Sequence, residues 1–101
     1  MSVVILAVGL FSVGLYGVLT RRDLIAILAS VEVMLGSATM LLVGLAAASG
    51  PIGEHQGAVE ATGVLVVAIA AAEAAIGLAL VMSVARRFQS TRADELTEVK
   101  G

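Results

Sequence analysis

The stretch Ile69-Ala-Ala-Ala-Glu73-Ala-Ala-Ile-Gly-Leu-Ala-Leu80 decides how this chain folds. It puts one carboxylate, Glu73, in the middle of an otherwise uncharged apolar run from residue 61 to residue 85. An apolar run longer than about 18 residues predicts a helix that crosses a membrane. A second carboxylate, Glu32, lies in a run of the same kind between residues 24 and 50. We therefore expect two acidic side chains inside a membrane.

Composition supports a membrane protein. The 101 residues are 59% hydrophobic and 14% charged, whereas a soluble domain carries about 25% charged residues. Apart from the two glutamates, the charges gather at residues 21–23, at residues 54–60 and after residue 85. No apolar run shows the polar face that a soluble amphipathic helix needs. The pattern predicts a polytopic membrane protein and excludes a soluble one.

The same counts exclude several functions. There is no cysteine, so disulfides and thiolate metal sites are excluded, and the one histidine, His55, does not make a metal site alone. The net charge of −2 gives no basic footprint for nucleic acid. No lysine or arginine precedes the first apolar run, so we do not expect a signal peptide.

Three spans follow from the apolar runs, because a spanning helix needs about 20 mainly apolar residues. We expect spans at about residues 2–19, 24–50 and 61–85, with Pro51 stopping the second of them. The fold class is an all-α membrane protein, one three-helix membrane domain over residues 1–101. A polar C-terminal tail follows at residues 86–101, and we expect its residues 89–101 to be mobile or docked on a partner.

Lysine and arginine placement predicts the orientation. The first loop carries Arg21 and Arg22 and the tail carries four basic residues, whereas the N-terminus and the loop around His55 carry none. Three spans put the first loop and the tail on one side. We expect that side to be cytoplasmic and the N-terminus to be outside.

Small residues predict where helices approach one another closely, since lipid supplies no hydrophobic drive for their association. The candidates are Gly9, Gly14, Gly17, Gly36, Gly44 and Gly77. The chain has only three aromatic residues, too few for a full aromatic belt. We expect other proteins, more than lipid, to cover it.

The two glutamates lie deep. Glu73 is 12 residues before Ala85, and Glu32 is eight residues after Leu24. These spacings correspond to about 18 Å and about 12 Å from the cytoplasmic helix ends, within a hydrocarbon core about 30 Å thick. In both cases an alanine precedes the acid by three residues and a glycine follows it by four, so each acid shares a helix face with small residues.

Intramembrane acids mark function by default, because a charge at a helix centre costs about 2.5–3.5 kcal/mol on insertion. Burial disfavours the charged carboxylate and a nearby cation favours it, so an acid under both influences can gain and lose a proton. Two such acids form a relay, and we expect Glu73 to have the larger effect because it lies deeper. The alternative is that both glutamates only hold helices together. Arg21 and Arg22 either reach in from the helix ends to support the acids or only set topology.

Two blocks resemble a known family. Arg21-Arg22-Asp-Leu-Ile-Ala-Ile-Leu-Ala-Ser-Val-Glu32-Val-Met-Leu and the Glu73 stretch resemble the two characteristic blocks of subunit K of proton-pumping NADH-quinone oxidoreductase, respiratory complex I. The resemblance covers essentially all three spans, although the first span and the tail match only in character.

The resemblance implies a subunit of the membrane arm in the cell inner (plasma) membrane, next to the A-, J- and N-type subunits. It implies that Glu32 and Glu73 are paired membrane glutamates of the proton-translocation relay, with Arg21 and Arg22 as cytoplasmic-side cations. It implies no cofactor in this chain, with NADH, FMN, iron–sulfur clusters and quinone bound by other subunits, and no independent monomer or catalytic activity.

Three other interpretations remain open. One is the C-type subunit of a multisubunit cation/proton antiporter, against which the alanine-rich block around Glu73 argues. Another is a rotor subunit of an ATP synthase, against which the third span argues. The last is a structural assembly factor whose glutamates hold helices together, which a glutamine exchange would separate from a relay.

Overall fold

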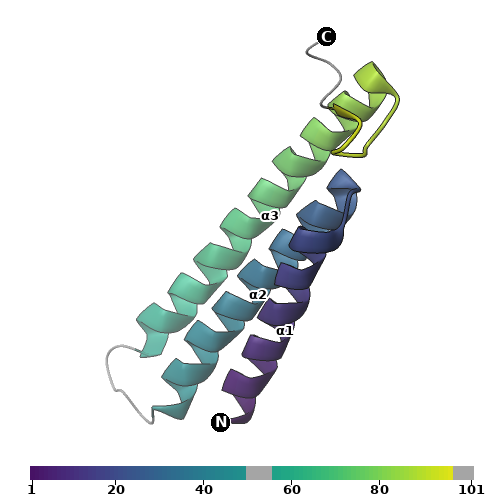
Figure 1. Ribbon diagram of the computed structural model, residues 1–101. Helices are drawn as coiled ribbons and strands as arrows, with labels where there is room; N and C mark the ends of the chain where they lie inside the picture. The colour runs from purple at the N-terminus through teal and green to yellow at the C-terminus, as the bar shows by residue number, and fades with distance from the viewer. Residues whose placement is uncertain (50–55, 97–101) are drawn as a thin grey trace.

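The computed structural model describes residues 1–49 and 56–96, which form three α-helices (Figure 1). Helix α1 is Ser2–Thr20, α2 is Leu24–Ala48 and α3 is Gln56–Phe88. All three are long and apolar enough to cross a membrane. The expected fold class, an all-α protein with three candidate transmembrane helices, is confirmed.

The helix ends differ from the expected spans. Helix α2 ends at Ala48, because the Ser49 N–H donates back to the carbonyls of Leu45 and Ala46 and closes the last turn. Helix α3 is longer than residues 61–85 at both ends and has 33 residues, or about 50 Å of helix. It therefore extends beyond a hydrocarbon core about 30 Å thick. Pro51 and the loop with His55 lie outside the described residues.

The three helices form one flat layer. Helix α2 lies between α1 and α3 and packs against both (Figure 1). The molecule measures 59 × 24 × 15 Å, and its radius of gyration is 17.3 Å, against about 13 Å for a compact domain of 100 residues. A single layer of helices leaves both of its faces open.

Almost nothing in this layer is buried. Among the described residues, the fully buried side chains other than glycine are those of Ala7, Ser37 and Val81. Large apolar side chains such as Ile5 and Leu80 are 69% and 62% exposed. An apolar surface of this extent needs lipid or other proteins around it.

Four of the six predicted glycines bring helices together. A Cβ on Gly14 would lie 2.6 Å from the Met34 side chain, and one on Gly77 would lie 2.9 Å from Leu28. Gly17 and Gly44 also face side chains of a neighbouring helix. Gly9 and Gly36 have nothing within 4 Å, so for these two the prediction of a close helix contact is wrong within this chain. Their sides of α1 and α2 are open.

The tail docks on the chain itself. After Phe88, Gln89 takes a positive φ of 55° and turns the chain, so that the following residues return to the first loop (Figure 1). There the Leu24 N–H donates to the Thr91 carbonyl (2.9 Å), and the Ala93 N–H donates to the Arg22 carbonyl (2.8 Å). The prediction of a tail that is mobile or docked on a partner is wrong for residues 89–96. Residues 97–101 lie outside the described residues.

Candidate functional site

The two membrane carboxylates lie at the same level. The side chain of Leu28 on α2 packs against Gly77 on α3. Glu32 follows Leu28 by four residues on α2, and Glu73 precedes Gly77 by four residues on α3. Because the two helices are antiparallel (Figure 1), both steps run in the same direction and cover about 6 Å. A second contact, between Val43 and Gly63, keeps the same register further along the pair.

Both carboxylates belong to the seam between α2 and α3. Glu32 follows Leu28 by four residues and precedes Leu35 by three, and residues at these spacings share one helix face. Leu28 contacts α3, so Glu32 lies on the α3-facing side of α2, where it is half-buried. Glu73 is more exposed. It lines a hollow of about 130 Å³ whose other walls are Leu35, Val66, Ile69 and Ala70.

The larger effect expected of Glu73 stays a prediction, but the register removes the reason given for it. Glu73 is further from the C-terminal end of α3 than Glu32 is from the start of α2, because α3 is longer. Where α2 packs against α3, however, the two glutamates lie at the same level along the helix pair. Depth therefore gives no reason for Glu73 to matter more than Glu32.

The seam has room for water beside Glu73. The hollow is larger than the space that one water molecule needs. Among the described residues, neither Glu32 nor Glu73 has a hydrogen-bond or ion-pair partner. A carboxyl in apolar surroundings without a partner in its own chain takes its hydrogen bonds from water or from another protein. The seam has room for such water at Glu73.

The two predicted supporting cations lie elsewhere. Arg21 and Arg22 are exposed in the loop between α1 and α2. Arg22 lies two residues before the start of α2 at Leu24, and Glu32 lies eight residues, or about 12 Å, further along the helix. The Arg22 guanidinium lies 3.9 Å from the Asp94 carboxylate of the tail. The structure brings the two arginines together with the tail and not with the glutamates.

Sequence reasoning missed the tail's own ion pair. The Arg92 guanidinium donates to the Asp94 carboxylate at 2.9 and 3.2 Å. This hydrogen bond lowers the pKa of Asp94 and raises the pKa of Arg92. Thr91 also approaches Asp23, whose carboxylate accepts from the Ile25 N–H and caps α2. The only sequence signal was the alternation of basic and acidic residues in the tail, which also occurs in solvated segments.

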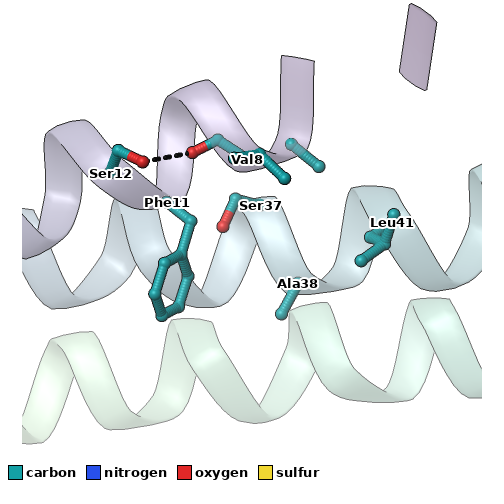
Figure 2. A pocket seen from close by; sticks show the side chains of 7 residues that line it. Val8, Phe11, Ser12, Ser37, Ala38 and Leu41 are labelled. Atoms are coloured by element: carbon teal, nitrogen blue, oxygen red, sulfur yellow. Dashed lines mark hydrogen bonds between the residues drawn. The ribbon is translucent and has the colours of Figure 1, made fainter. Parts of the chain in front are cut away.

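A larger hollow, of about 260 Å³, lies between α1 and α2 (Figure 2). Ala7, Val8, Phe11, Ser12, Ser37, Ala38 and Leu41 line it. The hydroxyls of Ser12 and Ser37 donate to the carbonyls of Val8 and Met34, each at 2.7 Å. The hollow contains no titratable group and is not a proton site. Within residues 1–49 and 56–96 no cluster of three histidine or acidic side chains is placed to hold a metal.

Fold and sequence together define a class: a multi-pass membrane protein with one carboxylate in each of two candidate transmembrane helices. The family model described as NADH-ubiquinone/plastoquinone oxidoreductase chain 4L matches residues 2–101. NADH-quinone oxidoreductase subunit 11 of Thermus thermophilus is 42% identical over 101 residues, 100% of both chains. Subunit K of Leptospira biflexa is 44% identical over 91 residues, 90% of this chain and 81% of that one.

Subunit K of Akkermansia muciniphila is 40% identical over 91 residues, 90% of this chain and 87% of that one. The chain belongs to the chain 4L family of NADH-ubiquinone/plastoquinone oxidoreductase. It is a membrane subunit of the multisubunit NADH-quinone oxidoreductase, complex I. These matches favour that complex over the antiporter and ATP synthase interpretations.

Proposed function

We propose that Glu32 and Glu73 form one proton relay within the proton-translocation path of NADH-quinone oxidoreductase. The observation that carries the proposal is their common level on the seam between α2 and α3. Two carboxyls at one level on neighbouring helices, with room for water beside Glu73, can exchange a proton without a change in the backbone.

The step needs only these two acids and water. Protonated Glu73 releases its proton to a water molecule in the hollow, and that water passes a proton to the carboxylate of Glu32. Glu73 gains the negative charge that Glu32 loses, so the pair carries a charge of −1 before and after the transfer.

The rest of the proposal concerns the setting of the relay. The arginine distribution favours a cytoplasmic first loop and tail, with Arg21 and Arg22 at the cytoplasmic end of the path and the N-terminus outside. The open sides of α1 and α2 at Gly9 and Gly36 suit neighbouring membrane-arm subunits of the A, J and N types in the cell inner (plasma) membrane. We assign NADH, FMN, iron–sulfur clusters and quinone to other subunits, so this chain's part is proton transfer alone.

The Glu73→Gln exchange tests the proposal. Glutamine keeps the shape and hydrogen bonding of the side chain but cannot carry the proton. We expect the complex to assemble, as seen on a native gel, and NADH-driven proton pumping in membrane vesicles to fall at least tenfold, within the usual range for removal of a group that transfers protons. Glu60→Gln, the same exchange outside the pair, is the matched control. Normal pumping by an assembled Glu73→Gln complex means that the glutamate only holds helices together.

A further inference from the structure

A positively charged hollow lies where the tail meets the first loop. Arg21, Arg22, Asp23, Ala26 and Arg92 line it, and its volume is about 480 Å³. We call it the arginine hollow. Three arginines against one aspartate give its lining a formal charge of +2, which suits an anionic ligand.

Contacts between the loop and the tail build the arginine hollow. The two backbone hydrogen bonds, from Leu24 to Thr91 and from Ala93 to Arg22, bring Arg92 beside the loop. Asp94 then fixes the Arg92 guanidinium at 2.9 Å. An arginine that is held before its ligand arrives loses less freedom on binding. Asp94 and Glu95 neutralise part of the Arg92 charge.

Arg21 supplies the charge that is free to bind. Arg22 is only 3.9 Å from Asp94 and shares that carboxylate with Arg92. Arg21 has no ion pair among the described residues. Arginine binds phosphate oxygens with two parallel N–H donors, so an unpaired arginine at the rim is suited to a phosphate group.

The position of the arginine hollow indicates which kind of molecule carries that phosphate. Arg21 directly follows α1, and Ala26 lies in the first turn of α2, so the hollow lies where two candidate transmembrane helices end. Lipid headgroups occupy this level of a membrane, and basic pockets here recognise anionic lipids. Leu15 and Leu19, at the adjoining end of α1, are 40% and 75% exposed, which provides an apolar surface for acyl chains.

We propose that the arginine hollow binds the phosphate of an anionic phospholipid, whose acyl chains lie along the exposed apolar side chains at the end of α1. Arg21 and Arg22 also lie at the cytoplasmic end of the proposed proton path, but neither takes part in the proton exchange between Glu32 and Glu73, and lipid binding is measured without pumping. Failure of the relay proposal leaves it unaffected.

The test measures lipid that is bound to the purified complex. The assembled complex is delipidated in detergent, offered phosphatidylglycerol or phosphatidylcholine, and analysed for retained lipid by native mass spectrometry. We expect the parent to retain phosphatidylglycerol in preference to phosphatidylcholine. The Arg21→Gln complex should bind phosphatidylglycerol about fivefold more weakly, the change expected for one arginine near a membrane surface. Arg21→Lys, which keeps the charge, should bind nearly as well as the parent.

Two controls show whether lipid binds at the arginine hollow and whether its acyl chains take part. Arg87 lies in the last turn of α3, where its guanidinium carbon is 5.4 Å from the centre of the Phe88 ring, and it does not line the hollow. Arg87→Gln should therefore bind lipid like the parent. An excess of inorganic phosphate should not displace the lipid if the acyl chains contribute. Equal phosphatidylglycerol retention by Arg21→Gln and the parent, an equal loss in Arg87→Gln, or displacement by inorganic phosphate overturns the proposal.

Discussion

Glu32 on α2 and Glu73 on α3 face one seam at the same level, although 41 residues separate them in the chain. The contact of Leu28 with Gly77 sets this register, because the missing side chain of the glycine lets the leucine sit between the helices. Each glutamate is four residues from that contact. The glycine that follows Glu73 thus does more than open a helix face: it fixes which residue of α2 the glutamate meets.

The packing of α1 on α2 predicts a selective effect of alanine at Gly14. A Cβ there would lie 2.6 Å from the Met34 side chain and 2.8 Å from the backbone carbonyl of Ser30, which does not move alone. We expect Gly14→Ala to destabilise the chain by about 1–3 kcal/mol. Unfolding of the full chain in mixed micelles, followed by circular dichroism, measures this. Gly9→Ala has open space around it and should not destabilise; equal stability of both variants contradicts the packing.

The tail predicts a pH-dependent contact. Because the hydrogen bond from Arg92 lowers the pKa of Asp94, the charged carboxylate favours the docked tail. Its contribution is complete above the ordinary aspartate value of 3.8 and is lost as the pH falls through the lowered pKa. The chain has no cysteine, so a double variant with Thr20→Cys and Leu96→Cys carries one spin label at each of these two positions and none elsewhere. The distance between them should be narrowly distributed at neutral pH and broaden in acid.

Asp94→Asn is the control for this effect, because it removes this one carboxylate at constant pH. The variant should show at neutral pH the broad distribution that the parent shows only in acid. If instead the parent and Asp94→Asn give the same narrow distribution at neutral pH, the Asp94 carboxylate does not hold the tail.

The open helix layer predicts dependence on partner subunits. Among the described residues, only Ala7, Ser37 and Val81 are buried apart from glycines. Expressed without the other membrane subunits, the chain should be degraded or aggregate within the membrane. Coexpression with neighbouring subunits should restore its amount, measured by immunoblot of membranes. Equal amounts of intact chain in membranes with and without the neighbouring subunits contradict this account of its surface.

The sequence was sufficient to predict the elements of the fold. Long apolar runs with charges only at their ends left helices across a membrane as the one arrangement that satisfies the backbone, and both glutamates stood out within them. The ends of the helices were harder to predict from the sequence. The periodicity of α3 does not change where the helix passes residue 61 or Ala85, so it gives no signal that the helix continues. Polar residues such as Glu60 and Arg86 continue the helix outside the apolar run.

Contacts between helices could not be predicted from the sequence of each apolar run taken by itself. Gly9 and Gly14 look alike in sequence, yet only Gly14 faces a neighbouring helix, because the choice depends on which side of α1 meets α2. The common level of Glu32 and Glu73 depends on the register of two helices, which neither helix encodes alone. The tail binds the first loop mainly through backbone groups, and these carry no sequence signature.

The central claim is that Glu32 and Glu73 act as one relay, and a double-mutant cycle tests it most directly. NADH-driven proton pumping is compared between Glu32→Gln, Glu73→Gln and the double variant in vesicles with matched amounts of assembled complex. Residues that act as a unit give strongly non-additive losses. We therefore predict that the double variant pumps as well as the more severe single variant. A double loss equal to the product of the two single losses contradicts the relay, because it means that each glutamate acts independently.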